Sequence, residues 1–188
     1  MTFPFHNFDT APENSKPFLE ESQKAFGRLP GLHKVLAESP QAFEAYQFLH
    51  KTFMATDFDA DELTVVWQAI NVEHECHYCV PAHTGIAKMM KVSDEIIDAL
   101  RNETPLPSEK LEALRTFTIQ MVRTRGNVSQ EQMDAFFAAG YGHRAVLDVI
   151  LGLAQKTMSN YINHVAETPV DEVFHPLKWT RSATPLEV

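Results

Sequence analysis

Signals for the start of a helix recur along the chain, and each one precedes apolar residues at helical spacing. A residue that can cap a helix stands before each run, at Ser39, Asp59, Ser93, Ser108 and Ser129. The side-chain oxygen of such a residue accepts a backbone N–H that the first helical turn leaves unpaired. No segment alternates apolar and polar residues as a strand does, and Asn-Gly and Asp-Gly hairpin turns are absent from the sequence. The sequence therefore predicts an all-α fold, a bundle of helices.

The length of 188 residues suits one domain with a substantial core. We expect the helical domain to cover residues 15–175, with its last and strongest helix running from about His143 to Val165. Residues 1–14 carry two prolines and no sustained period, so we expect an extended N-terminal arm. Residues 176–188 contain two more prolines and are expected to form a loop-rich tail.

Charge and hydropathy exclude several classes of protein. With 16 basic and 25 acidic side chains the net charge is −9, which disfavours nucleic-acid or anionic-membrane partners because Lys and Arg must neutralise their phosphates. No stretch approaches the roughly 20 apolar residues of a membrane helix, and the first residues lack a signal-peptide pattern. We therefore expect a cytoplasmic protein. In that reducing compartment, two cysteines serve redox or metal chemistry more often than structure.

The two cysteines, Cys76 and Cys79, stand three residues apart, and His83 follows one helical turn later. Pro81 suits the first turn of a helix, so we expect the pair at a helix N-terminus. At about 100° per residue, Cys76, Cys79 and His83 share one helical face. Exposed N–H groups and a nearby imidazole favour a thiolate there, and the helix dipole favours Cys76 as the more acidic thiol. A disulfide across this spacing requires adjustment of the turn and should be easily reduced. The pattern predicts a redox-active pair.

Two other interpretations stay open. The cysteines could be ordinary small core residues. They could also bind zinc in a non-enzymatic scaffold, because Cys76, Cys79 and His83 with His74 or His77 offer four nitrogen or sulfur ligands. Structural zinc sites usually draw their ligands from two separate segments, so the redox pair is favoured. No flavin, nicotinamide or haem motif is present, and we expect neither a cofactor nor a metal.

The run Cys76-His-Tyr-Cys79-Val-Pro-Ala-His83-Thr resembles the signature of the AhpD-like alkylhydroperoxidases, within the carboxymuconolactone decarboxylase superfamily. Residues 32–40 are similar to the family's lead-in helix, and residues 160–171 are similar to the ending of a peroxidase-related subgroup. The resemblance implies an all-helical fold and a homo-oligomer, either a trimer or a hexamer. It also implies that the cysteines reduce hydroperoxides, and that a thiol or dithiol reductant then reduces the resulting disulfide. Cys79 would be the attacking thiolate and Cys76 the resolving thiol, with His83 in a proton relay. This order is opposite to the one that the helix dipole favours.

The relay carboxylate is where this sequence departs from the family's pattern. The family usually has a Glu twelve residues before the first cysteine, and this sequence has Thr64 there. Glu62, two residues earlier, and Glu73, three residues before Cys76, are the two candidates for the relay. Each is otherwise an ordinary acid, Glu62 in a first helical turn and Glu73 in a solvated loop. The superfamily also contains lactone decarboxylases, acid–base enzymes that generally lack the cysteine pair, and these supply the alternative enzymatic class.

Some polar residues are expected to serve the fold alone. Asn160, Asn163 and His164 share one face of the last helix, where capping of the helix end is favoured over lining of a pocket or an inter-subunit contact. The histidines expected at the surface are His33, His50 and His143.

Overall fold

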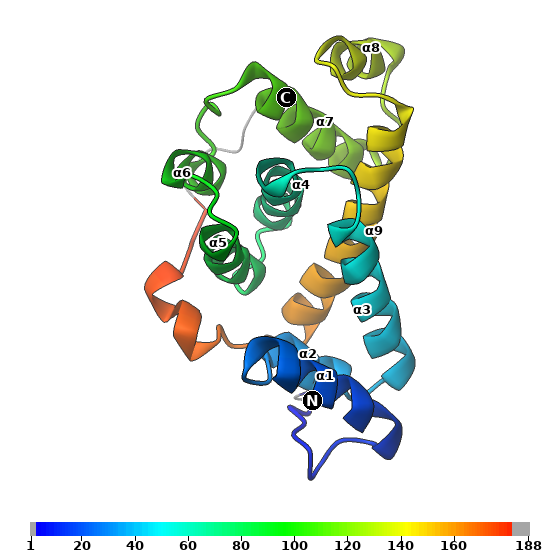
Figure 1. The fold of residues 1–188 in the computed structure, drawn as a ribbon, viewed down its shortest axis with the longest axis vertical. Coiled ribbons are helices and arrows are strands. Elements are labelled where there is room, and N and C mark those ends of the chain that lie inside the picture. The colour runs from blue at the N-terminus through cyan, green and yellow to red at the C-terminus, as the bar shows by residue number, and fades with distance from the viewer. Residues whose placement is uncertain (1–2, 182–188) are drawn as a thin grey trace.

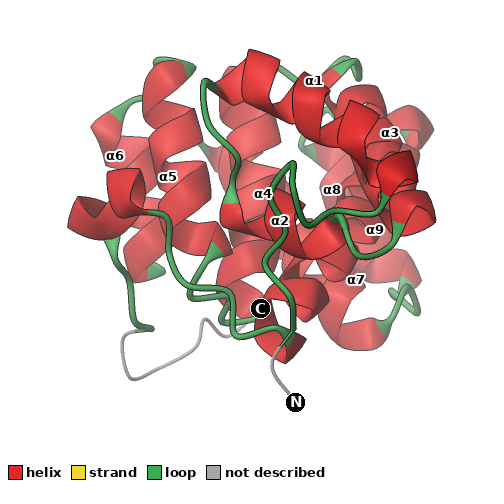
Figure 2. Cartoon of the chain, turned by 90° about the horizontal axis from the view of Figure 1, so that it is seen from below, coloured by secondary structure: helices red, strands yellow, loops and turns green. Residues whose placement is uncertain are grey.

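The computed structural model describes residues 3–181, and its regular elements in that range are all helical, as Figure 2 shows. The all-α prediction is confirmed. The elements in chain order are η1 (Glu13–Ser15), α1 (Lys16–Phe26), α2 (Gly31–Leu36), α3 (Pro40–Met54), α4 (Ala60–Glu73), α5 (Cys79–Met89), α6 (Asp94–Asn102), α7 (Glu109–Thr124), α8 (Gln130–Ala138), α9 (His143–Val165) and η2 (Glu172–Leu177), where η denotes a 3-10 helix.

Side-chain caps fix where five of the helices begin. Ser39, Asp59, Ser93, Ser108 and Ser129 each accept a hydrogen bond from the backbone N–H three residues further on. At Asp59 and Ser129 the third residue returns the bond and closes a capping box. Each cap contributes about 1 kcal/mol to helix stability. The five predicted helix starts are confirmed.

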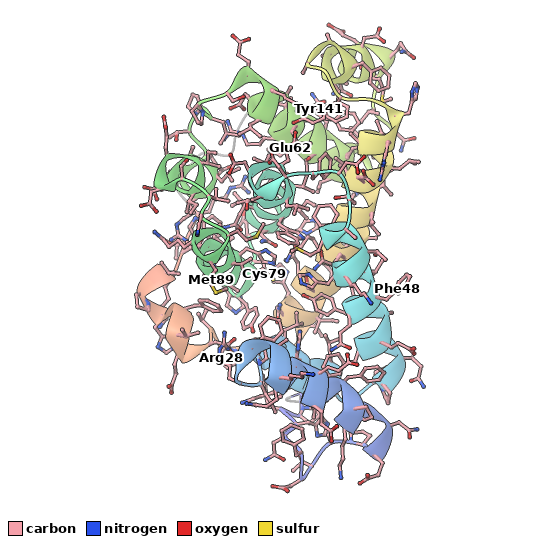
Figure 3. The ribbon with its side chains drawn as sticks, in the orientation of Figure 1. Arg28, Phe48, Glu62, Cys79, Met89 and Tyr141 are labelled. Atoms are coloured by element: carbon pink, nitrogen blue, oxygen red, sulfur yellow. The ribbon has the colours of Figure 1, made fainter. Side chains whose placement is uncertain are left out.

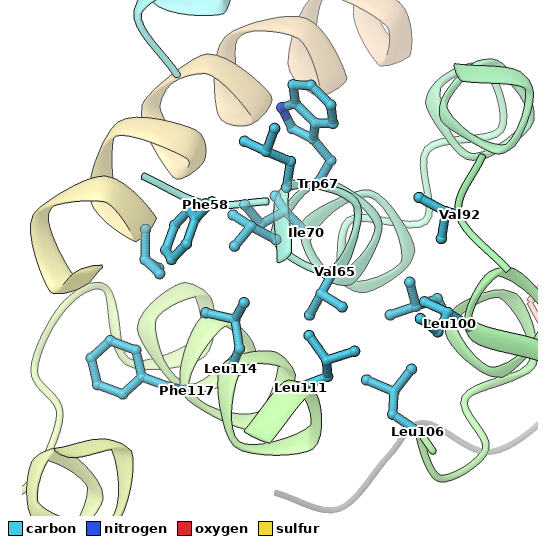
Figure 4. Packing of buried hydrophobic residues seen from close by; sticks show 14 of the residues in the cluster. Phe58, Val65, Trp67, Ile70, Val92, Leu100, Leu106, Leu111, Leu114 and Phe117 are labelled. Atoms are coloured by element: carbon cyan, nitrogen blue, oxygen red, sulfur yellow. The ribbon is translucent and has the colours of Figure 1, made fainter. Parts of the chain in front are cut away.

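Helix α4 lies in the middle of the molecule, viewed along its axis in Figure 1, and α5, α6, α7 and α9 pack around it. Every residue of α4 from Glu62 to Val72 is buried. A helix without an exposed face is stable only when other elements surround it. The apolar side chains of α4 form the larger core cluster with those of α6 to α9, around Trp67, Ile70 and Leu114 (Figure 4).

A second, smaller core cluster lies where the N-terminal helices meet the start of α5. Its buried members include Leu19 of α1, Phe43 of α3 and both cysteines. Helix α9 passes both clusters, because its 23 residues extend for about 35 Å. Val149 in its first half belongs to the larger cluster, and Ile162 near its end packs on the smaller one.

After α9 the chain returns across α5. The ring of Phe174 in η2 packs so closely on Gly85 that a Cβ there would lie 2.4 Å from the ring. Further on, Arg181 forms ion pairs with Glu103 at 2.8 Å and with Glu73 at 3.5 Å. These contacts fix the segment that follows α9 on the outside of the cysteine region.

The predicted arm and tail each contain part of a short helix in the structure. Residues 3–12 form turns without a regular helix, but η1 begins at Glu13, inside the expected arm. Likewise η2 crosses the expected boundary at residue 176. Residues 1–2 of the arm and 182–188 of the tail lie outside the described part, so the domain boundaries stay predictions. No single helix within residues 3–181 has both the length and the apolar character needed to cross a membrane.

Candidate active site

The two cysteines lie at the turn between α4 and α5. Helix α4 ends at Glu73 and α5 begins at Cys79, so Cys76 precedes the helix. The predicted placement of Cys76 inside the helix is wrong by three residues, because Glu75 has a left-handed backbone (φ 52°) that redirects the chain there. The carbonyl of Cys76 still accepts the N–H of Val80 at 3.1 Å, which holds Cys76 against the first turn of α5.

Both thiols are free and buried, with exposed fractions of 0% for Cys76 and 2% for Cys79. The backbone N–H of Cys79 donates to Sγ of Cys76 at 3.3 Å. The side-chain amide of Asn163, on α9, donates to Sγ of Cys79 at 3.2 Å. A donor aimed at a sulfur atom stabilises its thiolate form.

Cys79 is the more acidic thiol of the pair. Burial opposes its ionisation, but the hydrogen bond from the Cys76 thiol and the positive charge of Lys156 favour it. The amides of Asn160 and Asn163 add to this, and the pKa of Cys79 falls below its ordinary value. The hydrogen bond to Cys79, followed by burial, raises the pKa of Cys76. The helix-dipole expectation for Cys76 is therefore wrong, because Cys79 takes the first position of the helix.

Lys156 of α9 is the site residue that the sequence analysis missed. Its side chain is buried, with 1% exposed, and its Nζ lies 2.9 Å from Nε2 of His83. Burial lowers the pKa of Lys156 below its ordinary value, and the neighbouring Cys79 and Cys76 offset only part of this effect. The one signal in the sequence was the spacing of Lys156, Asn160 and Asn163, which places the three on one helical face.

His83 is buried on α5, one turn after Cys79. Because an ammonium group only donates, Nε2 of His83 accepts from Lys156 and the proton of the neutral imidazole stays on Nδ1. That Nδ1 is buried and has no hydrogen-bond partner among the described residues. Burial, then the positive charge of Lys156, lower the pKa of His83 well below its usual range. The ring of Trp67 lies 4.8 Å from the imidazole, between centroids.

Glu62, the first candidate for the relay, lies away from the thiols. Its carboxylate accepts hydrogen bonds from Lys110 at 2.8 Å, from the hydroxyl of Tyr141 at 3.1 Å and from the backbone of Asp59 at 3.1 Å. Figure 3 labels Glu62 beside Tyr141, on the α7 side of the molecule, whereas Cys79 lies toward α5. Glu62 therefore caps α4 at its start, and the cysteine turn follows the other end of that helix.

Glu73, the second candidate, is engaged outside the cysteine turn. Its carboxylate pairs with Arg123 at 2.7 Å and with Arg181 at 3.5 Å. The structure therefore brings neither predicted carboxylate to His83. Thr64, at the family's carboxylate position, is buried, and its hydroxyl has no partner among the described residues. The buried side chain that does contact His83 through its charged group is a lysine.

Asn160 and Asn163 line the cysteine turn. Nδ2 of Asn160 donates to Oδ1 of Asn71 at 3.0 Å, and its Oδ1 lies 2.9 Å from Nδ1 of His74. Asn163 contacts Cys79, as described above. The favoured expectation that these residues cap the helix end is wrong for both, because their face of α9 is buried and packs on this turn.

The ligand set that the zinc interpretation requires is not assembled. His77 bonds to the carbonyl of Thr168 at 3.0 Å and stacks on the exposed His164. His74 and His83 have the partners described above, Asn160 and Lys156. Within residues 3–181, no three His, Cys, Asp or Glu side chains are arranged to hold a metal ion.

Two of the histidines expected at the surface lie inside. His33 is buried, with Nδ1 2.5 Å from the hydroxyl of Ser22, and burial lowers its pKa to about 3. His50 is half-buried, accepts a hydrogen bond from Gln155 at 3.0 Å, and burial lowers its pKa to about 4. His143 is exposed, as expected.

Comparison with solved structures identifies the fold. The structure resembles the alkylhydroperoxidase AhpD core of a peroxidase-related protein from Ralstonia eutropha JMP134, with a TM-score of 0.80, 19% identity, and 92% of this chain and 93% of that chain covered. A peroxidase-related protein from Silicibacter sp. TM1040 has a TM-score of 0.78 to this structure, with 16% identity and 93% of both chains covered. The C82A form of the debrominase Bmp8, in complex with 2,3,4-tribromopyrrole, gives 0.76 at 16% identity and 94% coverage of both.

The chain therefore has the AhpD-like fold, as the resemblance in sequence implied. No protein-family model matches the sequence, and no curated protein matches it. At these identities the likeness shows the fold alone, and the chemistry depends on the side chains of this chain.

Proposed function

We propose that this protein is a thiol-dependent peroxidase and disulfide oxidoreductase that reduces hydroperoxides through a cycling Cys76–Cys79 pair. One observation carries the proposal: the buried Sγ of Cys79 accepts a hydrogen bond from Asn163, near the cation of Lys156. Cys76 stands beside it with its proton retained. A thiolate with a protonated thiol three residues away supplies an attacking and a resolving sulfur.

The reaction follows from these two sulfur atoms. The Cys79 thiolate attacks one oxygen of the hydroperoxide, the O–O bond breaks, and Cys79 becomes a sulfenic acid. The departing alkoxide takes a proton, for which Nδ1–H of His83 is the donor. The Cys76 thiol then attacks the sulfenic sulfur, water leaves, and the disulfide forms. A thiol or dithiol reductant returns two electrons by thiol–disulfide exchange.

The central test is the response of the reduced protein to one equivalent of cumene hydroperoxide. We expect both thiols to disappear and the mass to fall by two hydrogens, since the pair closes to a disulfide. Cys79→Ser should abolish turnover, and Cys76→Ser should stop at a sulfenic acid that dimedone traps on Cys79. His143→Gln, at an exposed position, serves as the matched control and should turn over normally.

Turnover retained by Cys79→Ser would overturn the proposal. Activity on a cyclic lactone acid that survives loss of both cysteines would support the decarboxylase alternative instead. The trimer or hexamer, the cytoplasmic location and the absence of nucleic-acid or membrane partners stay predictions, and sizing of the purified protein tests the first of them.

Reductive debromination is a second candidate function, which the likeness to the debrominase Bmp8 and its 2,3,4-tribromopyrrole complex favours. The dithiol holds the two electrons that replace a carbon–bromine bond by a carbon–hydrogen bond, with bromide and a proton released. Bromide release from 2,3,4-tribromopyrrole by the reduced protein, compared with the Cys79→Ser variant, decides whether the pair performs this chemistry.

A further inference from the structure

We infer that Lys156 stores the proton that the reaction consumes and delivers it through His83, so that a neutral amine remains beside the disulfide. The ammonium group gives a proton to Nε2 of His83 while Nδ1 of His83 gives its own proton to the departing oxygen. This inference rests on the proposed thiol chemistry. Its central claim, the number of protons bound when the disulfide is reduced, can be measured without any hydroperoxide.

The path for the proton is present in the contacts of His83. Nζ of Lys156 lies 2.9 Å from Nε2, and an ammonium group can only donate in that contact. At the other side of the ring, Nδ1 is buried and has no partner within residues 3–181. An imidazole that accepts at one nitrogen and donates at the other passes a proton without turning. Because Cys79 and His83 are four residues apart on α5, they share one helical face.

The charge of Lys156 is balanced by a single anion. No carboxylate within residues 3–181 forms an ion pair with Lys156, whereas the lysines at positions 16, 88 and 110 each pair with one. The side chain is 1% exposed, so bulk water does not solvate the ammonium group in place of an anion. The titratable groups that face it from the elements packed around α9 are His50 of α3, His74 at the end of α4, Cys76, Cys79 and His83. Of these, Cys79 alone carries a negative charge, because the histidines are neutral and Cys76 keeps its proton.

Formation of the disulfide removes that anion. An ammonium group buried without a counter-ion is strongly disfavoured, and a buried lysine then gives up its proton. The balanced reaction is Cys79–S⁻ + Cys76–SH + Lys156–NH₃⁺ + ROOH → Cys79–S–S–Cys76 + Lys156–NH₂ + ROH + H₂O. The oxidative half of the cycle therefore takes no proton from solvent, and the site is neutral before and after it.

Re-reduction of the disulfide must then take up two protons, one on Cys76 and one on Lys156. An arginine at position 156 stays charged in both states, because its guanidinium does not deprotonate in proteins. Lys156→Arg should therefore take up one proton, on Cys76 alone. Lys156→Met removes the charge, so the Cys79 thiolate should be lost near pH 7.

The experiment measures the redox equilibrium of the pair against reduced and oxidised dithiothreitol between pH 6.5 and 8, together with the ultraviolet absorbance of the thiolate. For wild type we expect a thiolate at pH 7 and an uptake of two protons per disulfide reduced. The reduction potential of the pair should then fall by about 59 mV per pH unit, at about 29.6 mV for each proton. Lys156→Arg should keep the thiolate and show half that slope, about 30 mV. Lys88→Arg, at an exposed lysine, is the matched control and should keep the wild-type slope.

A wild-type uptake of one proton with the thiolate present would overturn the inference, whatever the variants do. If Lys156→Arg fails to fold, judged by circular dichroism, the wild-type count and the loss of thiolate in Lys156→Met still decide it. An absent response to hydroperoxide with a two-proton uptake would reject the proposed function alone. Normal turnover with a one-proton uptake would reject the role of Lys156 alone.

Discussion

At the scale of single residues, burial decides the charge of three histidines on this chain. Burial lowers the pKa of His33 to about 3 and of His50 to about 4, and it lowers that of His83 well below its usual range. All three are therefore neutral at pH 7, although the sequence alone gives each an ordinary imidazole. For His83 this neutrality is what allows Nε2 to accept a hydrogen bond from Lys156.

The neutral state of His33 predicts a loss of stability in acid. In the unfolded chain its pKa is about 6.5, so between about pH 6.5 and 3 the unfolded state binds one more proton than the folded state. The free energy of unfolding then falls with falling pH, by up to about 1.4 kcal/mol per pH unit from this group. His33→Gln should reduce the loss between pH 7 and pH 5 by about 2 kcal/mol, measured by urea unfolding.

His143→Gln provides the control for that measurement, because His143 is exposed and should leave the acid loss unchanged. Equal losses in wild type and His33→Gln would show that His33 does not remain neutral in the folded protein.

At the scale of elements, the close approach of α9 to α3 and α4 depends on Gly152. A Cβ at this position would lie 2.8 Å from the ring of Phe53 and 2.9 Å from a methyl group of Val66, both fully buried. This close approach holds the middle of α9 against α3 and α4, and the next turn of α9 places Lys156 beside the cysteines.

Gly152→Ala should lower the free energy of unfolding by about 1–2 kcal/mol. An alanine inside a helix ordinarily adds up to about 1 kcal/mol of stability over glycine, but overpacking of a tight core costs about 1–3 kcal/mol. Urea unfolding gives the sign directly. In a Phe53→Leu background, which removes ring atoms near the new methyl group, the loss should shrink. A gain of stability in Gly152→Ala would mean that the helices separate easily at this contact.

Most of the helices that could be predicted begin at a cap that neighbouring residues reveal. The exception is α9, which begins without a side-chain cap bond and was predicted from its long apolar period. The cap at Ser129 and its partner Gln132 are three residues apart, so the sequence shows both. Helices α1 and α2 begin without a side-chain cap bond. The bounds of α1 were not predicted, and only the family resemblance of residues 32–40 indicated a helix near α2, which spans Gly31–Leu36. The start of α5 was misplaced because Glu75 adopts a positive φ, which glycine or asparagine would have signalled.

The residues of the candidate site likewise fall into those that the sequence predicted and those that it did not. Cys76, Cys79 and His83 lie within eight residues, so the sequence predicted them together. Lys156 is 73 residues from His83, and nothing beside it in the sequence distinguishes a buried lysine from a solvated one. Asn163 is 84 residues from Cys79, and its contact depends on how α9 packs. The charge partner of the thiolate is therefore determined by long-range packing of α9, and the local cysteine motif does not reveal it.

At the scale of the whole molecule, Asp171 joins three segments that are far apart in the sequence. Its carboxylate accepts hydrogen bonds from Arg28 at 2.7 Å, from the backbone of Gly31 at the start of α2 at 2.9 Å, and from the hydroxyl of Tyr78 at 2.9 Å. Tyr78 stands between the two cysteines in the sequence, and Asp171 directly precedes η2. The carboxylate thus ties the segment after α9 to both the N-terminal helices and the cysteine turn.

Asp171→Ala should weaken the fold and expose the thiols together. Removing one partner of a buried charged pair costs about 3–5 kcal/mol, and the partly exposed Arg28 places this case near about 3 kcal/mol. Because both thiols are buried, iodoacetamide reaches them only when the structure opens. If the segment after α9 forms that opening, alkylation of Cys79 should accelerate by about tenfold for each 1.4 kcal/mol lost.

The measurement pairs urea unfolding with the alkylation rate under native conditions. Asp57→Ala is the matched control, because its ion pair with Arg144 is 71% and 68% exposed and should change stability by less than about 1 kcal/mol. Lower stability with unchanged alkylation would place the route to the thiols elsewhere in the molecule. Wild-type values of both would show that the segment after α9 neither stabilises the fold nor closes the site.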